Sequence, residues 1–152
     1  MDTKIQNALN ERVSWETLYA QIGLVKSGIS FKEFAAAKSG NMFILNTHRQ
    51  IVFITRSVLD LFNIEDPAEV YGCRPGEMMR CELAHHDGCG VSEECQLCGA
   101  NQAANDCLKR NSAAHPFELL QKDSEEAIPF TVHAEAITLS GQLFMMISLI
   151  KK

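Results

Sequence analysis

Four cysteines stand close together in the middle of the chain and could act as one set of ligands. Cys81, Cys89, Cys95 and Cys98 follow the spacing Cys-x7-Cys-x5-Cys-x2-Cys. Thiolates are soft ligands that suit zinc or an iron–sulfur cluster, whereas calcium and magnesium prefer oxygen ligands. The spacing therefore predicts that these four residues bind a metal centre or cluster.

The ligand spacing does not determine the identity of the metal centre, but it favours one of the alternatives. Zinc sites more often combine two Cys-x-x-Cys pairs, and this chain has only the pair Cys95 and Cys98. The irregular spacing favours an iron–sulfur cluster of the four-iron type over a structural zinc ion, and a metal-free thiol switch is the third interpretation. We expect the pair to open a helix, because the partial positive charge of a helix N-terminus favours thiolates. Gly88, Gly90 and Gly99 would let the backbone come close to the centre.

The other cysteines and the histidines of this segment have weaker claims to be ligands. Cys107 shares a helix stripe with several alanines, so we expect a small buried residue there. Cys73 could be a spare ligand or a redox thiol, and the sequence favours neither role. His85 and His86 could each replace a cysteine ligand, but beside Asp87 they are interpreted as surface histidines.

Two arginines flank the proposed ligands. Arg74 and Arg80 either hold a loop and offset the negative charge of four thiolates, or are solvated surface charges. No pair of acids in the segment has a spacing that specifies acid–base chemistry, and no histidine has a visible partner for nucleophilic catalysis. We therefore expect a binding protein rather than an enzyme.

Composition and charge exclude several classes of protein. The 152 residues carry 14 Lys and Arg against 19 Asp and Glu, a net charge of -5. An acidic chain without basic runs has no electrostatic footprint for nucleic acid, and no apolar stretch approaches the roughly 20 residues that cross a membrane. The first residues do not resemble a signal peptide, so we expect a cytoplasmic protein whose six cysteines are ligands or redox thiols rather than disulfides.

Hydrophobic periodicity and turn residues divide the chain into helices and strands. Helices are predicted over 5–25, 31–38, 57–62, 66–70 and 98–108. Strands are predicted over 42–45, 50–54, 116–121, 128–137 and 142–150, the first two as a hairpin. This order is typical of an α+β fold in which a five-stranded antiparallel sheet carries helices on one face.

The last predicted strand is apolar on both of its faces. Leu143, Met145 and Ile147 alternate with Phe144 and Met146, so both faces need a cover. The amphipathic helix at the N-terminus, or a second copy of the chain, is the expected cover for the outer face.

Two stretches of the sequence resemble PAS domains, in which a helical segment separates the second and third strands of a five-stranded antiparallel sheet. The first is Phe43-Ile44-Leu45-Asn46 with Arg49-Gln50-Ile51-Val52-Phe53. The second is Val70-Tyr71-Gly72 with Arg74-Pro75-Gly76-Glu77. Its continuation into Cys81, Gly88-Cys89-Gly90, Cys95 and Cys98-Gly99-Ala100 is similar to a bacterial subgroup of cysteine-bearing PAS sensor domains. The resemblance covers about 31–150.

The resemblance implies a division of the chain and a function. Residues 1–30 would be a helix that caps the sheet or forms a dimer, and residues 31–152 a PAS domain with its metal-binding segment at 73–98. Such domains usually stand beside a histidine kinase or another output module. The implied function is a sensor of redox state or oxygen that signals through protein contacts, as a homodimer through the N-terminal helix and with a partner such as a histidine kinase.

Two other functions remain open. A structural zinc ion could fix a glycine-rich loop while the PAS pocket or the helix binds a partner. Cys95 and Cys98 could instead form the redox pair of a thiol oxidoreductase, although no strand–helix context of the thioredoxin kind surrounds them.

Overall fold

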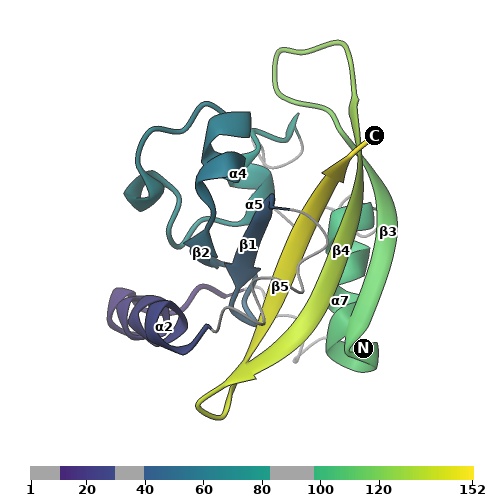
Figure 1. Ribbon diagram of the computed structural model, residues 1–152. Helices are drawn as coiled ribbons and strands as arrows, with labels where there is room; N and C mark the ends of the chain where they lie inside the picture. Colours follow the sequence, from purple (N-terminus) through teal and green to yellow (C-terminus); the bar gives the residue numbers. More distant parts are fainter. Residues whose placement is uncertain (1–10, 30–39, 83–97) are drawn as a thin grey trace.

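A five-stranded antiparallel sheet forms the centre of the fold (Figure 1). The computed structural model describes residues 11–29, 40–82 and 98–152. The strands lie in the order β2-β1-β5-β4-β3. They are β1 (Met42–Leu45), β2 (Ile51–Ile54), β3 (Ser112–Leu119), β4 (Ile128–Leu139) and β5 (Gln142–Lys151). The predicted hairpin of β1 and β2 and the predicted α+β class are confirmed.

Strand β3 begins at Ser112 rather than at the predicted Pro116. Proline cannot donate a ladder hydrogen bond, so it is rare in central strands and tolerated at sheet edges. β3 lies at the edge of the sheet, where Pro116 pairs with Thr131 of β4. The predicted start was wrong because the effect of a proline depends on its place in the sheet, which the sequence does not show.

One described helix precedes β1, and the others lie between β2 and β3. They are α2 (Trp15–Gly28), α4 (Arg56–Leu61), the 3-10 helix η1 (Pro67–Glu69), α5 (Pro75–Met78) and α7 (Gly99–Arg110). The helices predicted at 57–62, 66–70 and 98–108 are confirmed, whereas α5 was not predicted. The helix predicted at 31–38 lies outside the described residues. Among the helices that are described, none is long and apolar enough to cross a membrane.

The N-terminal helix starts later than its periodicity predicts. The Ser14 hydroxyl accepts a hydrogen bond from the backbone N–H of Thr17 at 3.2 Å, which caps α2 at its first turn. Residues 12–14 are not helical, so the prediction of one continuous helix over 5–25 is wrong at this point. Residues 1–10 lie outside the described part of the chain.

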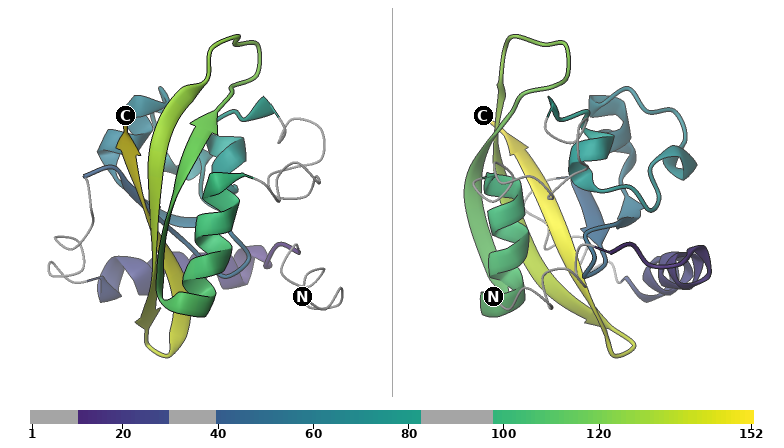
Figure 2. Two further views of the ribbon diagram at one scale, coloured as in Figure 1. Left: turned by 90° about the vertical axis from the view of Figure 1, so that its right-hand side faces the viewer. Right: turned by 180° about the vertical axis from the view of Figure 1, so that it is seen from behind.

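The sheet separates two hydrophobic cores. Met145, Ile147 and Leu149 of β5 belong to the core shared with α4, α5 and α7 on the inner face. Phe144 and Met146 belong to the core on the outer face, which α2 covers with Leu18, Ile22 and Val25. Figure 2 shows α7 and α2 on opposite sides of the sheet. The predicted double cover of the last strand, with the N-terminal helix on its outer face, is confirmed.

Candidate metal centre

Two of the four predicted ligands, Cys81 and Cys98, lie within the described residues. They stand at the two ends of the segment 83–97, and both are half-buried. The other two, Cys89 and Cys95, lie outside the described residues, as do His85 and His86. The structure therefore shows how the fold holds the two ends of the predicted ligand set.

The end of α5 fixes the backbone of Cys81. The N–H of Cys81 donates to the carbonyl of Gly76 at 2.8 Å, and the N–H of Arg80 donates to that of Glu77 at 3.4 Å. These two bonds form a Schellman motif, in which the residue after the helix adopts a left-handed conformation. Here that residue is Arg80, with φ of 60°, although glycine is usual at such positions. Cys81 is thus held at a sharp helix end.

The residues just after β3 fix Cys81 from the other side. Cys81 forms an isolated antiparallel bridge with Gln121, and the next residue donates its N–H to the carbonyl of Leu120 at 3.0 Å. The side-chain amide of Gln121 also donates to the carbonyl of Met79 at 3.1 Å. Contacts from two parts of the chain therefore position the first thiol.

Cys98 stands at the N-terminus of α7, as the sequence predicts. It is the N-cap residue, and its carbonyl accepts from the N–H of Gln102 at 2.9 Å. The next residue, Gly99, packs so closely on β3 that a Cβ atom there would lie 1.8 Å from the carbonyl oxygen of Pro116. Gly99 therefore lets the backbone of α7 come close to the sheet, and this contact holds the neighbouring Cys98 against β3.

Arg74 does not lie on the surface, so its interpretation as a solvated charge is wrong. Its side chain is only 2% exposed, and its Nε donates to the carbonyl of His48 in the β1–β2 turn at 3.2 Å. Arg49, next in that turn, donates from Nη1 to Oδ1 of Asn101 in the first turn of α7 at 2.9 Å. Two buried guanidinium groups thus tie the hairpin to the elements that carry Cys81 and Cys98. Arg80, by contrast, is exposed.

Comparison with known proteins identifies the fold. No family model matches the sequence, and no curated protein matches it either. Solved structures do match. One is a PAS domain from a two-component sensor histidine kinase, with 6% identity, a TM-score of 0.51 and coverage of 80% of this chain and 94% of that one. Another is the PAS domain of an HTR-like protein from Haloarcula marismortui, with 13% identity, a TM-score of 0.50 and the same coverage, 80% and 94%. The chain has the PAS fold.

Within this PAS fold, Cys107 is a structural residue. It is fully buried on α7, and its thiol donates to the carbonyl of Ala104 at 3.2 Å. Burial, with a smaller effect of the neighbouring Asp106 charge, raises the pKa of Cys107 to about 11. A thiol with this pKa stays protonated at neutral pH and is a poor ligand and nucleophile. The prediction of a small buried residue at this position is confirmed.

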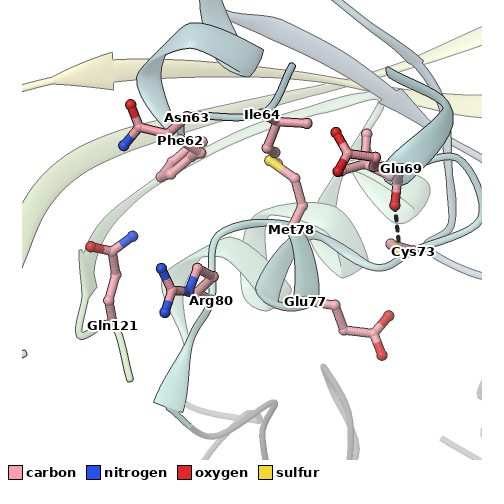
Figure 3. A pocket seen from close by; sticks show the side chains of 10 residues that line it. Phe62, Asn63, Ile64, Glu69, Cys73, Glu77, Met78, Arg80 and Gln121 are labelled. Carbon is pink, nitrogen blue, oxygen red and sulfur yellow. Dashed lines mark hydrogen bonds between the residues drawn. The ribbon is translucent and has the colours of Figure 1, made fainter. Parts of the chain in front are cut away.

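Cys73 is one of the residues that line a groove beside α5. The groove has a volume of about 370 Å³, and its lining includes Asn63, Arg80 and Gln121 (Figure 3). The thiol of Cys73 donates to the carbonyl of Glu69 at 3.8 Å. Burial and the charge of Glu77 raise the pKa of Cys73, and the charge of Arg12 only partly opposes this. A raised pKa disfavours the thiolate and therefore argues against the interpretation of Cys73 as a reactive redox thiol.

The two described thiols have the chemistry that a soft metal requires, but they do not form a site by themselves. No group of three or more His, Cys, Asp or Glu side chains within the described ranges could hold a metal ion. A complete set needs Cys89 and Cys95 as well. The contact between Arg49 and Asn101, which joins the hairpin to α7, was not predicted. Arg49 lies in one of the stretches that resemble PAS domains, but that resemblance indicates no partner for its side chain.

Proposed function

We propose that the chain is a signal-sensing PAS module in which Cys81, Cys89, Cys95 and Cys98 bind an iron–sulfur cluster of the four-iron type. The observation that carries the proposal is the fixed position of the two outer ligands. A Schellman motif and a β-bridge hold Cys81, and the start of α7 holds Cys98. A preorganised pair of thiols at both ends of a short segment lowers the entropy that is lost when a metal centre orders that segment.

The ligand spacing supports a cluster over zinc. The four cysteines follow Cys-x7-Cys-x5-Cys-x2-Cys, with Cys95 and Cys98 as the one short pair, whereas zinc sites more often combine two Cys-x-x-Cys pairs. Thiolate ligands at irregular spacing suit a four-iron cluster, in which each thiolate binds a different iron.

The proposed response is a change of the cluster on oxidation or exposure to oxygen, relayed by protein contacts in the cytoplasm. The PAS domain of a sensor histidine kinase among the similar structures supports a signalling role, and we propose a histidine kinase as the partner. The cluster would be a sensing group, and we propose no enzymatic activity. This description of the chain as a cysteine-bearing PAS sensor rests on the ligand set.

A homodimer through α2 would need the face of that helix that does not cover the sheet. Leu18, Ile22 and Val25 are already buried in the outer core. Trp15 and Tyr19 are each 65% exposed, with their ring centroids 5.8 Å apart. We propose that this aromatic pair forms the dimer contact. Sedimentation velocity should show a loss of dimer for Trp15→Ser, and an unchanged dimer for the control Leu143→Ser at another exposed apolar residue.

Anaerobic purification, followed by an absorption spectrum and metal analysis of the same sample, tests the proposed cluster. We expect a brown protein with about four irons per chain. The variant Cys98→Ser should lose the iron and the colour, whereas Cys107→Ala, a control at a buried cysteine that is not a ligand, should keep both. Circular dichroism of each variant checks that the fold is intact.

Each other outcome of this experiment has a defined meaning. A colourless protein with one zinc per chain would overturn the cluster and make the site structural, so the zinc-stabilised binding module would replace the sensor. A protein with neither metal, or one whose iron survives Cys98→Ser in a folded variant, would overturn the ligand set.

A further inference from the structure

The segment before α2 is tied to the loops beside the candidate metal centre. Nη2 of Arg12 donates to Oε2 of Glu77 at 2.6 Å, and Nη1 of Arg12 donates to the carbonyl of Gly72 at 3.2 Å. The backbone N–H of Val13 donates to Oε1 of Gln50 at 2.9 Å. The other end of the same amide, Nε2 of Gln50, donates to the carbonyl of Gly72 at 3.1 Å. We call this set of contacts the clasp.

Glu77 connects the clasp to the helix that carries Cys81. Its Oε1 accepts from the backbone N–H of Arg74 at 2.8 Å and so caps α5, while its Oε2 accepts from Arg12. Because α5 has only four residues, its other end is the turn in which the N–H of Cys81 bonds to Gly76. One short helix therefore separates the clasp from the first predicted ligand.

Arg12 in turn stands directly before α2. Ser14, the N-cap of α2, is two residues further along the chain (14 − 12 = 2). A displacement of Arg12 therefore acts on the first turn of the helix, where the side chain of Trp15 lies over Gly72. These contacts connect Cys81 through α5 and Glu77 to Arg12, and Arg12 is joined by two residues to the start of α2 on the outer face.

We propose that the clasp, rather than the sheet, transmits a change at Cys81 to α2. This inference rests on the proposed function, because it takes Cys81 as a ligand of the sensing centre. The central strand of the sheet, β5, pairs with β4 without a break from Gln142 to Lys151 and is buried on both faces from Phe144 to Leu149. Such packing is costly to distort. Within the clasp, the contact between Arg12 and Glu77 is polar and partly exposed, with the side chains at 41% and 28%, so it can open locally.

The mechanism has two states, and the ligation of Cys81 biases them. In the closed state Glu77 caps α5 and binds Arg12, and the first turn of α2 is held. When loss or oxidation of the centre releases the turn at Cys81, α5 shifts, Glu77 leaves Arg12, and the start of α2 is freed. A transmission of this kind requires only that the ligated centre prefers the closed state.

Hydrogen exchange tests the clasp. The chain of 152 residues is purified without oxygen, and its exchange rates are compared before and after exposure to air or EDTA. In the unmodified chain we expect faster exchange both at 75–82 and at the first turns of α2. In Arg12→Gln, exchange at residues 75–82 should still become faster on exposure to air or EDTA. The increase in the exchange rate of the first turns of α2 should be at least about fivefold smaller than in the unmodified chain. Arg12→Lys keeps the charge beside Glu77 and should recover part of that response.

Arg56→Gln is the matched control. Arg56 also pairs with an acid, Asp60, at 3.0 Å and also donates to backbone carbonyls, but it lies on α4, away from the clasp. This variant should respond like the unmodified chain. A full response of α2 in Arg12→Gln would overturn the clasp as the route and leave the sensing function intact. No response at 75–82 in any variant would instead overturn the proposed function, so the two failures are distinct.

Discussion

The two faces of the sheet are covered in different ways. On the inner face, α4, α5 and α7 share one large core with the sheet, and buried arginines tie the hairpin to α7 and to the turn before α5. On the outer face, α2 is the one helix of the described ranges that contributes to the core, with Leu18, Ile22 and Val25, and the polar clasp holds its start. The inner face is thus suited to fix the proposed ligands, and on the outer face a partly exposed polar contact holds the helix that we propose to move.

The largest expected effect comes from a glycine on the inner face. Gly99→Ala would place a Cβ 1.8 Å from the carbonyl oxygen of Pro116, and because that oxygen belongs to backbone, α7 and β3 must separate. We expect a loss of about 3 kcal/mol in the free energy of unfolding, measured in urea. On the outer face, Gly23 of α2 has no atom within 4 Å of its would-be Cβ. Gly23→Ala should therefore stabilise the protein by about 0.5–1 kcal/mol, through helix propensity alone.

Equal effects of the two glycine substitutions would contradict this comparison. If Gly99→Ala were neutral, the contact of α7 with β3 would not be tight enough to fix Cys98. The prediction therefore also tests the basis of the candidate site.

A smaller effect is expected where α2 meets the sheet. Leu18 is 1% exposed and lies against Gly72, so Leu18→Ala leaves a cavity between α2 and the sheet. We expect a loss of about 2–3 kcal/mol, with hydrogen exchange accelerated mainly in α2. Val132→Ala, in the inner core, should accelerate exchange across β3, β4 and β5 together. Uniform exchange in Leu18→Ala would mean that α2 opens only with the whole domain.

The smallest expected effect is a dependence of stability on pH at the clasp. Burial raises the pKa of Glu77, but the hydrogen bonds from Arg12 and from the Arg74 backbone, with the charges of both arginines, lower it below its ordinary value of 4.5. The carboxylate therefore adds stability that is complete above pH 4.5 and is lost as the pH falls through the lower folded pKa. Because Arg12 is 41% exposed, solvent screens the pair and the effect is about 0.5–1 kcal/mol.

Urea unfolding between about pH 6 and pH 3 measures this dependence, and Glu77→Gln should remove the part that belongs to the clasp. Asp60→Asn, at a more exposed ion pair with Arg56, provides the control and should change the profile little. An identical profile for Glu77→Gln and the unmodified chain would show that the clasp contributes nothing to folding stability.

Much of the fold could be predicted because its signals are local. The apolar runs of β1, β2 and β5, the alanine stripe of α7 and the doubly apolar pattern of the last strand each lie within a few residues. The errors arose where the answer depends on distant neighbours. Pro116 is tolerated because β3 is an edge strand, and Arg74 is buried because the β1–β2 turn offers it a carbonyl.

The candidate site divides in the same way. The type and spacing of Cys81, Cys89, Cys95 and Cys98 are properties of the chain, so the soft-metal chemistry that they permit follows from the residues alone. Cys107 could be set apart from them for the same reason, since its helix stripe marks it as buried. Tertiary structure decided the rest. Two sets of contacts join residues far apart in sequence: those that attach the outer proposed ligands to β3 and Gln121, and the clasp between Arg12 and Glu77. Only the folded backbone brings such groups close together.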